Sequence, residues 1–401
     1  MNNLKKKIYQ NFSLYLFFVY FLWLITLTVY YFFSEYIKAG GLENGVKYGG
    51  DSFWYLEKSR NIINGDFSIL KYKSYFGYMF FLAPFLYFEL PLYYVVLFQI
   101  VLTGISAFCL YKITEKFFCK LSGLISIFLF LLYFPLQLRN FYVLTEILFI
   151  DITIILIFFI VFFKKKYLVP IVFLLIFLMS LRPNGILLLF SIFISSFIYI
   201  IFNKKYSYLI YYLAFLLTIS IPVIFFLNSY LLELNLLGAL NNNGIIWGYS
   251  FETNQVCKLS CLSEELKIKN LPNNLLGYLE FVSINYVEYF KLFFLKIFWF
   301  LLRARPYYSD LHNFYILFLN IILYSSFVYG FMKKPKNLFS INCIIFFILL
   351  STVLVGLTFV DWSGRFSLFI LPLIMIFSSY GILAFIKKIF KMVKQKWKYT
   401  S

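Results

Sequence analysis

The chain has 401 residues, of which 62% are hydrophobic and 13% are charged, and its formal net charge is +19. So few charged side chains cannot cover the surface of a water-soluble protein of this size, which excludes a soluble globular enzyme. Several windows of about 20 residues hold almost no charge, and a helix of that length crosses the ~30 Å hydrocarbon core of a bilayer. The composition therefore predicts an all-α integral membrane protein.

Hydropathy predicts about ten transmembrane helices. The first follows Lys5, Lys6 and Lys7 and resembles the start of a signal peptide. It is too long for a signal peptide and lacks a small-residue cleavage site, so we expect a retained anchor. The expected spans are residues 12–33, 92–113, 121–136, 141–163, 167–181, 185–202, 206–228, 313–331, 338–360 and 366–386.

Lysine placement predicts the orientation of these spans. Lysines cluster before the first span and at residues 112–120, 164–166, 204–205, 333–336 and 387–398. If all clusters are cytoplasmic, both termini lie inside a multi-pass protein of the plasma (inner) membrane. The apolar segment 286–302 carries Glu288, Lys291 and Lys296, and a crossing there would move residues 333–336 outside. We therefore expect that segment to lie in the outer interface. The lysine excess serves topology and contact with anionic membrane lipids, so nucleic acid is not an expected partner.

Two outer loops result, at about residues 34–91 and 231–312. Neither is large enough for a separate soluble domain, so residues 1–401 are expected to form a single polytopic membrane domain. Within the second loop, Cys257 and Cys261 leave two alternatives open, a disulfide and a pair of free thiols. His312 is the only histidine, so a Cys/His zinc site is not expected.

Arginine follows a different pattern from lysine. In the topology above, every arginine falls at or beyond the outer membrane face, where the positive-inside rule disfavours it. The guanidinium group grips phosphate with a rigid two-pronged fork, whereas lysine offers a point charge. The pattern predicts a phosphate-bearing ligand at the outer face, with interfacial anchoring or ion pairing as the alternative. The arginines are Arg60, Arg139, Arg182, Arg303, Arg305 and Arg365.

A polar stretch just after the first span predicts a short amphipathic helix with Asp51 immediately before its first turn. Its apolar face is expected to comprise Tyr55, Leu56, Ser59, Ile62 and Ile63, and its polar face Glu57, Lys58, Arg60, Asn61 and Asn64. Gly65 is a natural helix stop. Two interpretations of Asp51 are compatible: either Asp51 or Ser52 caps the helix, and Asp51 is also placed to act as a general base.

Four motifs in chain order resemble the GT-C superfamily of membrane glycosyltransferases, which includes protein O-mannosyltransferases and the transferase that adds aminoarabinose to lipid A. The first is Asp51-Ser52 followed by a helix similar to "YLxxAxNLLxG". The second, "LTEILF" at residues 144–149, resembles "LTEPLF". The third, "LRPNGILLL" at residues 181–189, resembles "RPxGLLLL". The fourth, "GRFSLFILPL" at residues 364–373, resembles "RYxLPLLP". Together they cover most of the chain.

The resemblance implies a GT-C-like fold and an inverting transferase at the outer membrane face. It would move a sugar from a polyprenyl-phosphate-linked donor to a hydroxyl of a lipid or glycan acceptor. Asp51 matches the catalytic carboxylate and would take the acceptor's proton. Fixed cations would stabilise the charge that develops on the leaving phosphate. The candidates are Arg182 and Arg365 at matching motif positions, followed by Arg303, Arg305 and Lys71.

One departure from the family pattern concerns the second acid. Many members have an Asp-Glu pair where this chain has Asp51-Ser52, so Glu146 becomes the candidate second acid. Asp151 lies deeper in the same expected span, where we expect it to pair with a lysine or arginine of a neighbouring helix. No cofactor is expected. Carboxylates could hold a divalent cation, but the missing Asp-Glu pair argues against a metal site.

Two other classes share part of this pattern. An O-antigen-type polysaccharide polymerase is also multi-span with arginine-rich outer loops, but its largest loop would come later and no Asp-led helix would follow the first span. A lipid-linked oligosaccharide flippase would show two related halves and polar residues along several spans. Neither pattern is found in this sequence.

Overall fold

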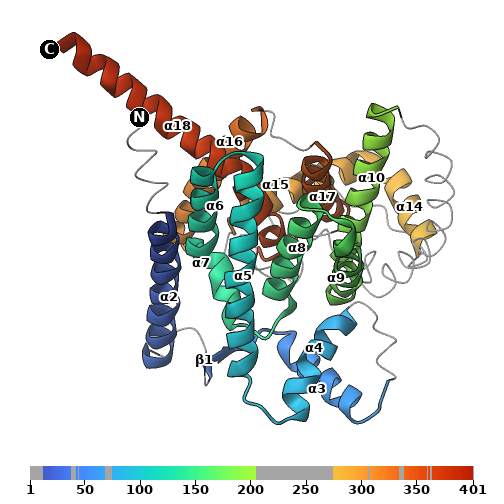
Figure 1. The fold of residues 1–401 in the computed structure, drawn as a ribbon. Coiled ribbons are helices and arrows are strands. Elements are labelled where there is room, and N and C mark those ends of the chain that lie inside the picture. The colour runs from blue at the N-terminus through green and yellow to red at the C-terminus, as the bar shows by residue number, and fades with distance from the viewer. Residues whose placement is uncertain are drawn as a thin grey trace. The chain divides into compact units, whose positions relative to one another are not determined.

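The computed structural model describes residues 12–37, 42–43, 45–67, 75–204, 274–305, 308–333, 338–358, 360–361 and 364–400. Within these residues, helices make up almost all of the structure, and one antiparallel hairpin joins β1 (Leu42–Glu43) to β2 (Val46–Lys47) (Figure 1). The chain divides into two compact units. The first comprises Met1–Ile186, Ile322–Ser340 and Leu371–Ser401, and the second comprises Leu187–Ile321 and Ile341–Ile370.

The first unit is built from long helices joined by short ones. They are α2 (Phe12–Ile37), α3 (Ser52–Ile63), α4 (Phe76–Tyr87), α5 (Tyr93–Phe117), α6 (Lys120–Leu132), α7 (Phe134–Gln137), η3 (Leu138–Phe141), α8 (Thr145–Val161), η4 (Lys165–Tyr167), α9 (Leu168–Leu181), η5 (Pro183–Gly185), the second half of α16 (Asp310–Phe331) and α18 (Leu371–Thr400). The second unit contains α10 (Ile186–Phe202), α14 (Leu275–Ile284), α15 (Tyr286–Leu302), the first half of α16, most of α17 (Leu338–Leu357) and η6 (Phe366–Phe369).

The structure confirms an all-α membrane protein. In the described part of the chain, six helices are long and apolar enough to cross a bilayer, or seven if one bent pair counts as a single span. The six are Ser13–Phe32, Tyr93–Phe117, Pro183–Phe202, Asp310–Phe331, Leu338–Leu357 and Leu371–Met392, and the bent pair is Lys120–Leu132 with Phe134–Phe141. The count of about ten stays a prediction, and its span at 206–228 lies outside the described residues, as does most of the second outer loop.

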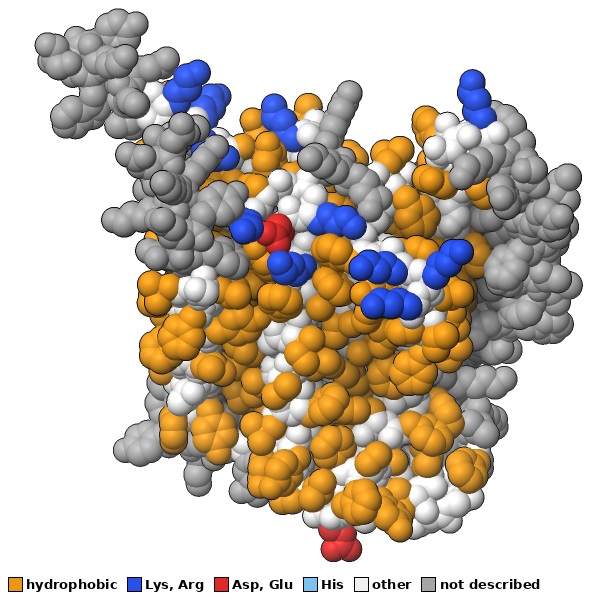
Figure 2. Space-filling model, viewed as in Figure 1, with side chains coloured by type: hydrophobic (Ala, Val, Ile, Leu, Met, Phe, Trp, Pro, Cys, Tyr) orange, Lys and Arg blue, Asp and Glu red, His pale blue; other side chains and the backbone are white. Residues whose placement is uncertain are grey.

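Hydrophobic side chains cover much of the surface of these helices. In Figure 2 they fill most of the face over α2, α5 and α6, while Lys and Arg side chains gather toward the end where α5 leads into α6. The exposed positions include Phe17, Phe21, Val101, Ile105 and Phe108. Side chains of this kind, exposed in rows along long helices, are suited to contact with lipid tails.

Nine lysines of the first unit lie at one end of its helices, which we call the lysine end. Helices α5 and α8 run in the same direction, as two hydrogen bonds show. The Gln99 side chain donates to the Tyr142 carbonyl near their starts, and Lys116 donates to the Val161 carbonyl at their ends. In α18, Tyr380 stacks on Phe118 near that same end, and basic residues follow it. The end carries Lys112, Lys116, Lys120, Lys164, Lys165, Lys166, Lys387, Lys388 and Lys391. Three separate lysine clusters, at residues 112–120, 164–166 and 387–391, therefore share one side, as the positive-inside rule requires.

The predicted amphipathic helix is confirmed as α3. Its buried residues are Ser52, Tyr55, Leu56, Ser59 and Ile62, which match the expected apolar face apart from half-buried Ile63 and the added Ser52. Helix α3 packs on the short apolar helix α4. The chain leaves α3 through Gly65, whose φ of +78° lies in the left-handed region that favours glycine.

The segment 286–302 forms α15 with the expected bounds, and its placement in the outer interface stays a prediction. Lys296 on this helix is fully buried, and its Nζ donates to the Thr358 carbonyl, 2.6 Å away, just beyond the end of α17. This hydrogen bond joins α15 to the end of α17, which the sequence did not indicate.

Glycines allow α16 and α18 to pack closely in the first unit. A Cβ at Gly330 would collide with the backbone oxygen of Phe377, and a Cβ at Gly381 would collide with that of Ser326. Ser378 adds a hydrogen bond of 2.7 Å from its Oγ to the Leu323 carbonyl. Small residues at such crossings let helix backbones approach closely inside a bilayer.

We expect Gly330→Ala to lower the stability of the protein in detergent by about 1–3 kcal/mol, because the new methyl group must push two backbones apart. The matched control is Gly104→Ala in α5, where the new Cβ would lie 3.7 Å from the Trp23 ring, an ordinary contact. Thermal unfolding of the two variants in the same detergent measures the difference. Equal melting temperatures would show that the close crossing contributes nothing.

Candidate functional site

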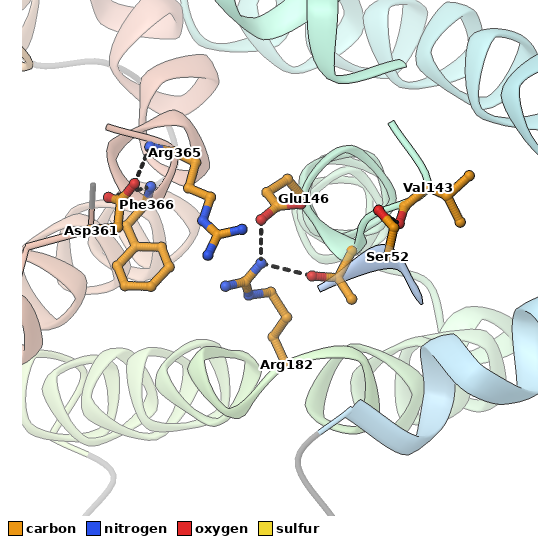
Figure 3. A network of polar contacts seen from close by, with 8 residues as sticks. Ser52, Val143, Glu146, Arg182, Asp361, Arg365 and Phe366 are labelled. Carbon is orange, nitrogen blue, oxygen red and sulfur yellow. Dashed lines mark hydrogen bonds and ion pairs between the residues drawn. The ribbon is translucent and has the colours of Figure 1, made fainter. Parts of the chain in front are cut away.

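Asp51 lies directly before α3 with its side chain exposed. Its side chain makes no capping hydrogen bond to the helix. Ser52 serves the local structure instead, since its Oγ accepts from the Gly49 amide at 2.8 Å and donates to the Val143 carbonyl at 2.9 Å (Figure 3). Of the two residues considered as caps, Ser52 thus fixes the turn, and the Asp51 carboxylate stays at the surface at the start of a well-anchored helix.

Val143, which accepts the hydrogen bond from Ser52, belongs to a segment that contacts both α3 and the strand before it. The Val143 amide donates to the Lys47 carbonyl at 3.2 Å, and Lys47 forms a parallel bridge with Tyr142. Ser52 then binds the carbonyl of the same Val143. This segment leads directly into α8, so one side-chain and one backbone hydrogen bond link the chain around Asp51 to the start of that helix.

Glu146 in the first turn of α8 forms a buried ion pair with Arg182. The Arg182 Nη1 donates to the Glu146 Oε1 at 3.0 Å and to the Thr145 Oγ1 at 2.7 Å (Figure 3). Glu146 is 1% exposed and Arg182 is 4% exposed. The Arg182 guanidinium also lies 5.8 Å from the centre of the Tyr75 ring. A buried charge of either sign is costly by itself, so the two residues depend on each other.

The local sequence explains why these charges meet. Helices α8 and α9 pack against each other and are joined by the short η4, so the start of α8 and the end of α9 lie together. Glu146 is at the N-terminus of one helix, and Arg182 is the C-terminal cap of the other. Each charge therefore also has a favourable helix dipole beside it. Pro183 directly after Arg182 begins η5 and turns the chain into α10.

Tyr55 on the buried face of α3 lies among these charged groups. Burial raises the pKa of its hydroxyl well above the usual range, and Tyr75, Glu146 and Asp51 raise it further, while Arg182 lowers it. The hydroxyl therefore stays neutral at ordinary pH. Its ring contacts Tyr75 and Tyr78, with centres 5.6 Å and 5.1 Å away. Three tyrosine rings thus pack together beside the ion pair in the first unit.

The remaining arginine candidates belong to the second unit. Arg305 is 1% exposed, and its guanidinium donates to the Trp299, Ala304 and Asp361 carbonyls at 2.9–3.1 Å. Those contacts stabilise the end of α15. Arg303 is also buried and has a left-handed backbone with φ of +60°.

Asp361 and Arg365, which the sequence suggested as a pair across one turn, meet through the backbone. The Asp361 carboxylate accepts from the Arg365 amide at 2.6 Å and from the Phe366 amide at 3.0 Å, which caps η6 (Figure 3). The Arg365 side chain is half-buried, with its guanidinium 5.9 Å from the centre of the Phe366 ring.

Two candidates from the sequence, Glu146 and Arg182, meet in the first unit, and the charges of both and of Asp51 act on Tyr55. Lys71, Cys257 and Cys261 lie outside the described residues. Sequence reasoning missed Thr145 and the link from Ser52 to Val143. Thr145 is part of the quoted "LTEILF" motif and could have been noticed beside Glu146, whereas no local signal points to a backbone carbonyl as the partner of Ser52.

No family model matches the chain, and no curated protein matches it either. Within the described residues, no three His, Cys, Asp or Glu side chains gather as a metal site.

We expect Glu146→Gln to destabilise the protein by about 3 kcal/mol, because it leaves the Arg182 charge buried without its counter-charge. The matched control is Glu115→Gln, whose carboxylate pairs with Lys112 at 2.9 Å while both side chains are partly exposed. Exposed pairs contribute less than about 1 kcal/mol. Denaturant or thermal unfolding in detergent measures both losses. If the two losses were equal and small, the ion pair of Glu146 and Arg182 would not anchor α8 to α9.

Proposed function

We propose that the protein is a membrane glycosyltransferase that moves a sugar from a polyprenyl-phosphate-linked donor to a hydroxyl of a lipid or glycan acceptor. The reaction takes place at the outer face of the plasma (inner) membrane, and both termini are cytoplasmic. One observation supports this proposal most: Asp51 is an exposed carboxylate at the start of an anchored helix, in the same unit as the buried Glu146–Arg182 pair and at the end opposite the lysines. The four motifs that resemble the GT-C superfamily add the reaction class.

The proposed chemistry uses Asp51 as the general base. As the acceptor oxygen attacks the anomeric carbon, its proton passes to the Asp51 carboxylate. The bond between that carbon and the phosphate oxygen breaks, and the polyprenyl phosphate leaves with the electron pair. Attack opposite the leaving group inverts the sugar carbon. An exposed carboxylate suits this role, because it meets an acceptor from the water phase without a conformational change.

Arg182 and Glu146 have a joint role in this proposal. The two opposite charges form a neutral pair. Within it, Glu146 orients the Arg182 guanidinium so that its N–H groups can donate directed hydrogen bonds to the donor phosphate. Glu146 is thus a positioning residue rather than a second acid. Among the arginines of the second unit, half-buried Arg365 is the first candidate for the donor phosphate, and Arg305 is the weakest because three carbonyls already bind its guanidinium.

We expect Asp51→Asn to reduce sugar transfer at least about 100-fold, the range in which a general base contributes. The fold should survive, since Asp51 makes no capping hydrogen bond. The assay is release of polyprenyl phosphate in proteoliposomes supplied with polyprenyl-phosphate hexoses and pentoses and a membrane extract as acceptor. The matched control is Asp66→Asn, an exposed carboxylate just after the same helix.

Two outcomes would contradict the proposal. Full turnover by Asp51→Asn would remove Asp51 from the mechanism. A folded wild-type protein that consumes none of the donors would contradict the assignment as a glycosyltransferase.

A further inference from the structure

A row of buried polar side chains crosses the interior of the first unit. It links α2, α7, η3, α5 and α8, and no member is more than 3% exposed. We call this row the polar relay, and it consists of Trp23, Gln137, Asn140, Thr103, Ser106 and Asp151. The sequence led us to expect a basic partner for Asp151. Within the described residues, Asp151 instead meets two hydroxyl groups.

The direction of each hydrogen bond follows from the first group. The Trp23 indole N–H can only donate, and it lies 2.8 Å from the Gln137 side chain. The atom facing it must therefore be the Gln137 oxygen, Oε1. The amide nitrogen of Gln137 then donates to the Phe130 carbonyl at 2.8 Å, which accepts only. The orientation of Gln137 is thereby fixed.

Gln137 in turn fixes Asn140. Its Oε1 and its backbone carbonyl, both acceptors, lie 3.1 Å and 3.2 Å from one end of the Asn140 amide. That end must be the nitrogen, so the other end is the acceptor Oδ1. The Oδ1 lies 2.9 Å from the Thr103 hydroxyl, and a hydroxyl facing an acceptor must donate to it. The Thr103 hydroxyl has only one proton, and it uses that proton in the hydrogen bond to Asn140.

Under this assignment, Thr103 has no hydroxyl proton left to donate in a hydrogen bond to Asp151. The Asp151 Oδ2 lies 2.8 Å from the Thr103 Oγ, which can present only lone pairs in that direction. Two oxygens at this distance with no proton between them repel each other. We infer that Asp151 is a neutral carboxylic acid whose Oδ2 holds a proton and donates it to Thr103. Its other oxygen, Oδ1, lies 2.5 Å from the Ser106 hydroxyl, closer than the 3.0 Å from that hydroxyl to the Thr103 carbonyl, so Ser106 donates to Oδ1 and both oxygens of the carboxyl group have a partner.

The surroundings of Asp151 agree with a neutral acid. Its side chain is fully buried, and none of the ion pairs among the described residues includes it. The titratable group that faces it from α5 is the Cys109 thiol. An ionised carboxylate at such depth in a membrane protein is costly without a counter-charge.

The proton gives Asp151 a positioning role. The relay holds Asn140 and Gln137 against α5, and Gln99 adds bonds from its amide nitrogen to the Asn140 and Tyr142 carbonyls at 2.8 Å and 3.1 Å. Gln137, Asn140 and Tyr142 belong to the segment that ends at Val143, whose carbonyl accepts the hydrogen bond from Ser52. Ionisation of Asp151 would break the relay at Thr103 and loosen that segment. The inference does not rest on the proposed transferase activity.

Infrared spectroscopy tests the inference on the full-length protein in detergent at neutral pH. The chain has five aspartates, so labelling their side-chain carboxyls with ¹³C marks few groups. The expected result is a C=O stretching band of a protonated acid that shifts with the label and disappears in Asp151→Asn. This variant retains a donor toward Thr103 and an acceptor toward Ser106, so it should melt near the wild-type temperature. Asp151→Val removes both and should melt at a lower temperature.

Thr103→Val keeps the test decisive if Asp151→Asn does not fold. It removes the acceptor of the Asp151 proton without changing the size of the side chain, so the acid band of the labelled protein should move. A purely structural role of Asp151 as a carboxylate predicts neither observation. Absence of a label-sensitive acid band in the wild-type protein, or a band unchanged by both substitutions, would overturn the inference.

Discussion

The buried ion pair of Glu146 and Arg182 is the interaction on which the candidate site depends. It joins the first turn of α8 to the last residue of α9, and each charge is almost completely removed from water. Neither residue would be tolerable there without the other, because a lone buried charge costs several kcal/mol. The pair therefore fixes how the α8–α9 hairpin closes. Thr145, Tyr75 and Tyr55 take their positions around it.

The same physical constraint explains the rest of the first unit. Helices of apolar residues provide little specificity to one another in lipid, so buried polar groups must find partners on other elements. Residues 137–146 concentrate these partners: Gln137 and Asn140 join the polar relay, Val143 binds α3, and Glu146 binds α9. One short segment thus connects a proton on Asp151, deep in α8, with the exposed carboxylate of Asp51. Hydrogen bonds in the interior of the first unit therefore help to position Asp51, the candidate base.

The sequence predicted features that depend on local periodicity. The buried face of α3, its end at Gly65 and the bounds of α15 all follow from spacing and helix signals. Partners across the fold were not predictable in this way. Glu146 and Arg182 are 36 residues apart, and their meeting depends on how two helices pack. Asp151 was expected beside a basic residue, but hydroxyls of α5 take that place because a neutral acid needs hydrogen bonds rather than charge.

In the proposed orientation, the end of the first unit with Asp51, Glu146 and Arg182 faces the outside of the cell. Cysteine labelling in a cysteine-free background tests it most directly, at Asn64→Cys beside α3 and at Lys120→Cys at the lysine end, both exposed positions. A membrane-impermeant reagent should label position 64 in intact cells and position 120 only after permeabilisation. Labelling of position 120 from outside, with position 64 protected until permeabilisation, would contradict this orientation.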